Sequence, residues 1–192
     1  MKPRYMRPQL CVDLDKKVDG CYVQCTASVP DVRDDKKEAR FFRLRVKNTT
    51  RFVANDVRAY LSKVEKWAGE AYVPSPYTDS LRLAWSWERV LEENRTNPKT
   101  KGISLFLGHY DYVDICSTYR DYSRVFLGLL YYPEEYKSLL DHPGRYRLSI
   151  TVVGDNADPR DLRIIVIWTG KWNEVKVVSE SWFRVYGHQI TA

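Results

Sequence analysis

The chain alternates repeatedly between apolar and polar residues, which is the pattern of a β-strand with one buried and one solvated face. In ARFFRLRVKN, residues 39–48, the apolar residues Phe42, Leu44 and Val46 are separated by basic residues. The same two-residue period recurs in LRLAWSWE (81–88), and it predicts that Leu81, Leu83, Trp85 and Trp87 share one face of a core strand. It returns in RYRLSITVV (145–153) and LRIIVIW (162–168).

Residues 51–67, RFVANDVRAYLSKVEKW, fit two interpretations. Val53, Val57, Leu61 and Val64 have helical spacing. The alternation of Val57, Ala59 and Leu61 after the turn residues 48–50 favours a second antiparallel strand, and we prefer the strand.

The remaining runs predict further short elements. QLCVDL (9–14) and CYVQCTA (21–27) predict a hairpin around Val18-Asp19-Gly20, and ISLFLGHYDYVDIC (103–116) predicts two strands hinged at Gly108. RVFLGLLY (124–131) predicts another strand, PEEYKSLLD (133–141) a helical turn, and residues 172–187 a last strand or a tail. Many short strands separated by turn signals predict an all-β antiparallel sandwich with short helical turns in its loops. We expect a single domain over residues 1–192.

The string Pro143-Gly-Arg-Tyr146-Arg-Leu148 resembles the tyrosine corner before the penultimate strand of immunoglobulin-like sandwiches. The wider pattern of RLRVKNTT, LAWSW, GxYxLxIxVxxDNA and IxWxGxW resembles a loose group of uncharacterised prokaryotic immunoglobulin-like domains, over about residues 40–172. The resemblance implies that the Tyr146 hydroxyl ties down the neighbouring loop and that Leu148 stands where antibody domains have a cysteine. It implies an immunoglobulin-like fold and transfers no catalytic residue. From the fold we expect Trp85, Tyr146, Leu148 and Trp168 to share one core.

The amino-acid composition bears on the class of the protein and on its cellular location. The content of apolar residues, 44%, is that of a globular protein. The longest apolar run, residues 125–132, is far too short to span a bilayer, so we expect no membrane insertion. Four cysteines are too few for a disulfide scaffold, and Cys21 and Cys25 lack a second ligand pair at zinc spacing. We therefore expect reduced cysteines and a cytoplasmic location.

The linker GDNADPRD, residues 154–161, concentrates oxygen-bearing side chains between two strands. It lacks the alternate acids, the sixth-position glycine and the twelfth-position glutamate of an EF-hand calcium loop. Gly154, Asn156 and Pro159 are residues typical of turns. A structural turn is therefore preferred to a cation site, and we expect no metal and no cofactor.

Positive charge is concentrated between residues 36 and 66, where ten Lys or Arg face three acids in a chain of net charge +6. Outward basic side chains on adjacent strands would form one positive face able to attract phosphates. The candidate residues of this basic stripe are Arg43, Arg45, Lys47, Arg51 and Arg58.

A second basic and aromatic cluster lies in STYRDYSR, residues 117–124. Its candidate residues for stacking on and pairing with a nucleotide or a single strand are Tyr119, Arg120, Tyr122 and Arg124. For both groups the plainer alternative is a solvated sheet face with ordinary loop aromatics.

No motif of a known catalytic site occurs: G-x-S-x-G, the P-loop, G-x-G-x-x-G and H-E-x-x-H are all missing. His109 and Asp111 could be assembled into acid–base chemistry, although an amphipathic strand explains both. We therefore expect a non-catalytic binding or sensing module that binds another protein, as the soluble part of a larger assembly. Binding of nucleic acid or a phosphorylated ligand through the basic face is the second hypothesis, and an unrecognised hydrolase is the third.

Overall fold

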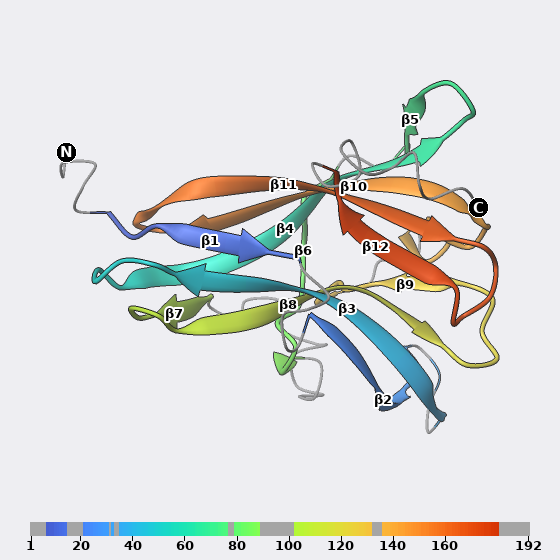
Figure 1. Ribbon diagram of the computed structural model, residues 1–192, viewed down its shortest axis with the longest axis horizontal. Coiled ribbons are helices and arrows are strands. Elements are labelled where there is room, and N and C mark those ends of the chain that lie inside the picture. Colours follow the sequence, from blue (N-terminus) through green and yellow to red (C-terminus); the bar gives the residue numbers. More distant parts are fainter. Residues whose placement is uncertain are drawn as a thin grey trace.

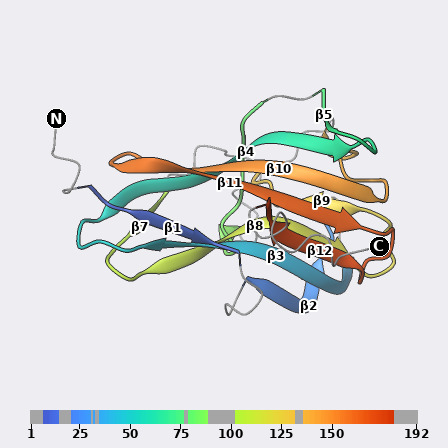
Figure 2. The ribbon, with the colours of Figure 1, turned by 45° about the horizontal axis from the view of Figure 1, so that its top comes forward.

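The structure, a computed structural model, describes residues 7–14, 21–30, 32, 35–76, 79–88, 102–131 and 136–180. These residues form antiparallel strands and no helix, and the strands lie in two sheets that face each other (Figures 1 and 2). The prediction of an all-β protein is thereby confirmed. The prediction of short helical turns is wrong for the described residues: 136–140 form turns, and 133–135 lie outside the described part.

The smaller sheet is built around the long strand β3 (Lys36–Asn48). One edge of β3 pairs with β8 (Tyr110–Tyr119), which in turn pairs with β9 (Val125–Leu127). The other edge pairs with β1 (Leu10–Asp13) and β2 (Tyr22–Ser28), one after the other. Each of these pairs is antiparallel.

The predicted hairpin between the first two strands is wrong, because β1 and β2 do not pair with each other. Leu10 lies opposite Asn48 and Tyr22 lies opposite Phe42, so both strands run antiparallel to the same neighbour, β3. Strand β3 is long enough to pair with two short strands in succession. The turn expected at residues 18–20 lies outside the described residues.

The larger sheet has the strand order β12-β11-β10-β4-β5, and two short strands, β6 and β7, also pair with β4. Its strands are β4 (Ala54–Trp67), β5 (Tyr72–Pro74), β6 (Leu81–Arg82), β7 (Ile103–Leu105), β10 (Gly144–Gly154), β11 (Ala157–Trp168) and β12 (Val175–Ser179). Strand β4 confirms the preference for a strand over a helix at residues 51–67. Within it Val57, Ala59 and Leu61 are buried, as their alternation predicts.

The core lies between the sheets and contains residues of both, such as Leu44 of β3 and Leu148 of β10. Trp85, Tyr146 and Trp168 are buried in the same cluster, so the predicted shared core is confirmed. The Tyr146 hydroxyl donates a hydrogen bond of 2.5 Å to the carbonyl oxygen of His142 and so holds the preceding loop. Burial raises the pKa of this phenol.

The predicted core strand at residues 81–88 is only partly correct. Its first two residues form β6, which pairs with β4. The chain then crosses to the smaller sheet, where Trp85 forms an isolated β-bridge with Val113. The chain turns directly afterwards, with the Glu88 amide donating to the Trp85 carbonyl oxygen at 2.9 Å. Trp87 is therefore exposed, and its indole nitrogen donates to Asp111 at 2.9 Å.

Candidate binding surface at one end of the sandwich

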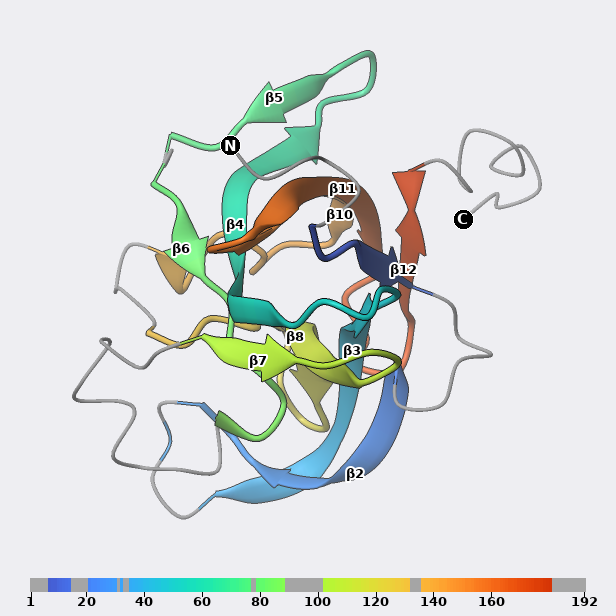
Figure 3. The ribbon, with the colours of Figure 1, turned by 90° about the vertical axis from the view of Figure 1, so that its left-hand side faces the viewer.

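Three turns gather at the end of the sandwich where β3 ends and β8 begins (Figure 1, left end; Figure 3, facing the viewer). They connect β3 to β4, β7 to β8 and β10 to β11. The first two cross from one sheet to the other, because β3 and β8 belong to the smaller sheet and β4 and β7 to the larger. This end of the sandwich is the candidate binding surface.

Asn48, a fully buried residue at the end of β3, joins two of these turns. Its side-chain amide donates to the carbonyl oxygens of Phe52 and Leu105 at 2.6 and 2.8 Å, and its Oδ1 accepts the Thr50 amide at 3.0 Å. The Asn48 backbone completes the link, since its amide donates to the His109 carbonyl at 3.1 Å and its carbonyl accepts the Gly108 amide at 2.9 Å. A buried polar group with all its hydrogen bonds made fixes the local backbone.

The turn within GDNADPRD is confirmed, and it is shorter than predicted. Gly154 pairs with Ala157, which leaves Asp155 and Asn156 as the connecting residues, and Pro159 already belongs to β11. The Asn156 side chain accepts the Asn55 amide at 2.9 Å and donates to the Val53 carbonyl at 2.8 Å. The third turn is therefore tied to the start of β4.

The acids of this linker have separate partners. Asp158 pairs with Arg7 at 3.0 Å, and Asp161 accepts the Thr151 hydroxyl at 2.7 Å. Within the described part of the chain, no three His, Cys, Asp or Glu residues come together in a way that could hold a metal ion.

Calcium is expected to leave the melting temperature unchanged. A site that binds only the folded state would add about 2.7 kcal/mol at a hundredfold excess over Kd, which is a shift of several degrees. Melting is measured with millimolar calcium and again with chelator, with the Asp155→Asn/Asp161→Asn variant as the control. A rise with calcium that disappears in the variant would show that the linker is a ligand site.

The turn between β7 and β8 carries two adjacent exposed apolar side chains, Phe106 and Leu107, which we call the apolar tip. Their exposed fractions are 53% and 58%. Gly108 follows with a φ of +74°, a conformation that favours glycine, and the His109 amide closes the turn onto the Phe106 carbonyl at 3.0 Å. The hinge predicted at Gly108 is confirmed, whereas Phe106 and Leu107 lie outside both strands. Two consecutive apolar residues before that glycine, which break the alternation of Ile103 and Leu105, are the signal that could have identified the tip.

The basic stripe does not form the single positive face that the sequence predicts. Arg58 belongs to β4 and therefore to the other sheet from Arg43, Arg45 and Lys47, because β3 and β4 are not hydrogen-bonded neighbours. Arg51 lies in the turn between them.

Three of these arginines are also neutralised by carboxylates. Arg43 pairs with Asp114 at 2.8 Å, Arg45 with Asp13 at 2.8 Å, and Arg58 with Asp56 at 2.5 Å. The hydrogen bond to Asp13 raises the pKa of Arg45 further. Burial alone would raise the pKa of Asp56, but hydrogen bonds from the Gly102 amide and Arg58 outweigh it, so this pKa is lowered.

The second predicted cluster is also dispersed. Tyr119 is buried in a small core with Phe41 and Phe126, so its predicted stacking on a ligand is wrong. The other three side chains have local partners: Arg120 lies 3.6 Å from Glu38, Tyr122 donates to Asp35 at 2.8 Å, and Arg124 lies over the ring of Phe126.

The geometry around His109 gives the hydrolase hypothesis no support. Both carboxylate oxygens of Asp111 are engaged, one by the Tyr112 amide at 2.7 Å and the other by the Trp87 indole at 2.9 Å. The His109 ring packs against Phe106 with 5.7 Å between the ring centroids. The two residues therefore serve local structure.

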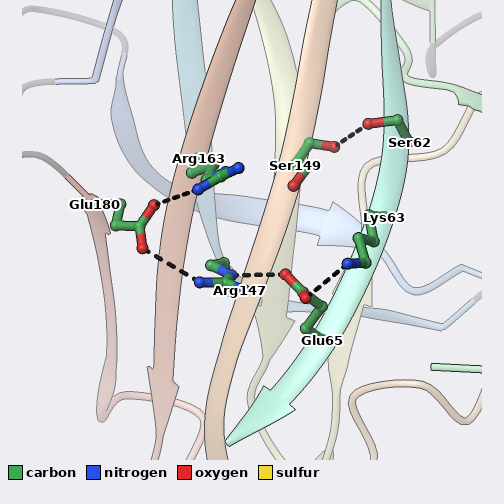
Figure 4. Close-up of polar contacts among 7 residues, drawn as sticks. All are labelled: Ser62, Lys63, Glu65, Arg147, Ser149, Arg163 and Glu180. Atoms are coloured by element: carbon green, nitrogen blue, oxygen red, sulfur yellow. Dashed lines mark hydrogen bonds and ion pairs between the residues drawn. The ribbon is translucent and has the colours of Figure 1, made fainter. Parts of the chain in front are cut away.

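An ionic cluster centred on the buried Glu65, on the outer face of the larger sheet, is not predicted from the sequence (Figure 4). The Glu65 carboxylate on β4 accepts a hydrogen bond from the Arg147 guanidinium on β10 at 2.6 Å. It also lies 2.8 Å from the Lys63 ammonium. Arg147 also reaches Glu180 at 3.4 Å, and Arg163 lies 3.7 Å from the same acid. The hydrogen bond from Arg147 outweighs burial and holds the pKa of Glu65 at about 2. The charged members of the cluster are paired with one another across neighbouring strands.

No protein-family model matches this chain, and it matches no curated protein sequence and no solved structure. None of its described residues belongs to a helix that could cross a membrane.

Proposed function

We propose that this chain is a non-catalytic binding module and that the apolar tip is the centre of its binding surface. The observation that carries the proposal is that Phe106 and Leu107 are more than half exposed in a turn whose flanking residues, Leu105 and Gly108, are both hydrogen-bonded to Asn48. Exposed apolar side chains cost free energy in water, and a rigid turn loses little entropy on binding. Both properties are typical of a recognition surface.

The proposal includes an immunoglobulin-like sandwich acting as a single domain. The hydrogen bond from Tyr146 to His142 at the start of β10 supports this assignment. A cytoplasmic location is also part of the proposal, and it is supported by four cysteines that form no disulfide. Burial, and then the nearby Asp13, raise the pKa of the Cys11 thiol, which favours the protonated form.

The second candidate, binding of nucleic acid or a phosphorylated ligand, now depends on Lys47 and Arg51 rather than on the whole stripe. Neither residue has an ion pair with any described residue, although Arg51 lies 5.2 Å over the Phe52 ring. Retention on heparin that is lost between low and moderate salt would favour this candidate, because affinity for phosphates falls steeply with salt.

The proposal is tested by capture from an extract that retains both soluble proteins and membrane vesicles. We expect immobilised protein to bind material at moderate salt, and the Phe106→Ser/Leu107→Ser variant to lose it. The matched control is Val73→Ser, which removes an equally exposed apolar side chain (51%) from β5, away from the tip. Equal capture by wild type and the tip variant would refute the proposal.

A further inference from the structure

The apolar tip is bordered by cationic and aromatic side chains. Lys47 and Tyr110 lie opposite each other on β3 and β8, and Tyr110 is 52% exposed. The Arg45 guanidinium lies 5.6 Å over the Tyr110 ring, while its charge is satisfied by Asp13. Of the basic stripe, Arg43, Arg45 and Arg58 have carboxylate partners, whereas Lys47 and Arg51 have no ion pair with a described residue.

The two turns that cross between the sheets contain no carboxylate. Residues 49–53 read TTRFV and residues 106–109 read FLGH. The acid that next follows each turn is already engaged, Asp56 by Arg58 and the Gly102 amide, and Asp111 by Trp87 and Tyr112. Asp155 is the one exposed acid of the neighbouring turn between β10 and β11. Apolar side chains beside a cationic turn, at the same end of the sandwich, are complementary to an apolar medium beneath a layer of negative charge (Figure 1).

The form of the tip favours a lipid surface over a protein pocket. A standard protein interface takes about 20–30 residues from each side, whereas the apolar part here consists of two adjacent side chains at the apex of one turn. Apolar side chains of this kind can enter the boundary between headgroups and acyl chains without a matching pocket. Tyrosine is enriched at the headgroup level, which is the position of Tyr110 below the apex.

We propose that the apolar tip binds an anionic lipid surface. Phe106 and Leu107 enter the boundary between the headgroups and the acyl chains, and Lys47 and Arg51 bind the lipid phosphates. This inference rests on the proposed function, which assigns the tip as the binding surface. It requires no membrane-spanning segment, and it fits a cytoplasmic protein, because the cytoplasmic leaflet carries anionic lipid.

The experiment measures sedimentation of the full chain with vesicles of phosphatidylcholine alone and of phosphatidylcholine mixed with phosphatidylserine. Wild type is expected to bind the mixed vesicles. Phe106→Ser/Leu107→Ser is expected to weaken this binding about a hundredfold, because the inserted apolar area is lost. Lys47→Gln/Arg51→Gln is expected to weaken it about thirtyfold, to the level seen with phosphatidylcholine alone. Val73→Ser is the control, and the melting of each variant shows that it is folded.

Three outcomes would overturn the lipid inference. Wild type that does not sediment with the mixed vesicles has no affinity for anionic lipid. If the tip variant still binds the mixed vesicles, the binding does not involve the tip. Capture from extract that depends on the tip, together with no vesicle binding, leaves the proposed function intact and shows that the partner is not an anionic lipid surface. Failure of both experiments removes the proposed function as well.

Discussion

Replacing Leu148 by alanine is expected to lower the free energy of unfolding by about 2–5 kcal/mol, the range for a large buried aliphatic side chain truncated in a packed core. Leu148 has no exposed surface and lies at the middle of β10, between Ile164 of β11 and Val64 of β4. All three belong to the core between the sheets. The truncation leaves a cavity that backbone paired on both sides cannot easily close.

The loss of unfolding free energy is measured by urea denaturation at neutral pH. If the slope of unfolding free energy against urea concentration is unchanged, the variant and the wild type unfold in the same reaction. Ser149→Ala is the matched control. Ser149 is the next residue of the same strand, and its carbonyl, which accepts the Ser62 hydroxyl at 3.1 Å, is kept in the variant (Figure 4). Its expected change is within about 0.5 kcal/mol. Equal effects of the two substitutions would contradict the core assignment of Leu148.

Alternation along the sequence was sufficient to predict most strands and the faces that they bury. The residues Phe42, Leu44 and Val46 are buried as predicted, and so are Tyr146 and Leu148. This succeeds because the two-residue period is a local property of an extended chain, so it can be recognised without knowledge of the neighbouring strand. It failed at Trp87, where the chain turns and the period ends.

Which strands become neighbours could not be predicted, because pairing depends on contacts between residues distant in sequence. Arg43 and Asp114 are separated by 71 residues, and Arg147 and Glu65 by 82. The sequence therefore indicated a run of basic residues, whereas the fold places a carboxylate beside three of them. The same limitation explains why the predicted N-terminal hairpin is wrong. Two strand patterns that are adjacent in sequence predict pairing with each other, but both strands pair with β3.

The candidate surface was missed for a different reason. The sequence predicts the hinge at Gly108, but the same run predicts that Phe106 and Leu107 belong to a strand, where apolar side chains need no further explanation. Their exposure follows from the pairing of β7 with β4 and of β8 with β3, which leaves the connection at the end of the sandwich. Asn48, the residue that holds this connection, is a turn residue in sequence and a buried hydrogen-bonding centre in the fold.

The ion pair of Glu65 with Arg147 is expected to make the stability of the protein sensitive to acid. The ordinary pKa of the Glu65 carboxyl is 4.5, and in the folded state it is lowered to about 2, chiefly by the hydrogen bond from Arg147. A carboxyl whose pKa is lower in the folded state binds its proton more readily when unfolded. Its contribution to stability is therefore complete above pH 4.5 and is lost as the pH falls towards 2.

The Glu65→Gln variant is expected to lose about 3 kcal/mol of unfolding free energy at neutral pH, which corresponds to the difference between these two pKa values. The side chain is buried, so solvent screens the pair little, and breaking a buried pair leaves the Arg147 charge with Glu180, at 3.4 Å, as its remaining acid. Unfolding free energies of wild type and variant are measured from pH 7 to pH 2. The difference should be largest at neutral pH and shrink steadily below pH 4.5.

The matched control is Glu174→Gln, which removes one partner of the exposed ion pair with Lys171. Water and salt screen this pair, so the variant should unfold like wild type at every pH. Glu180→Gln serves as a second comparison within the cluster, because Glu180 contacts the same arginine from the opposite side at 3.4 Å, against 2.6 Å for Glu65. Glu180→Gln should therefore lose less unfolding free energy than Glu65→Gln. If the deficit of Glu65→Gln were constant between pH 7 and pH 2, the carboxylate charge would not be its source, and the loss would have to come from packing around Tyr72, whose ring lies 4.3 Å from the Arg147 guanidinium.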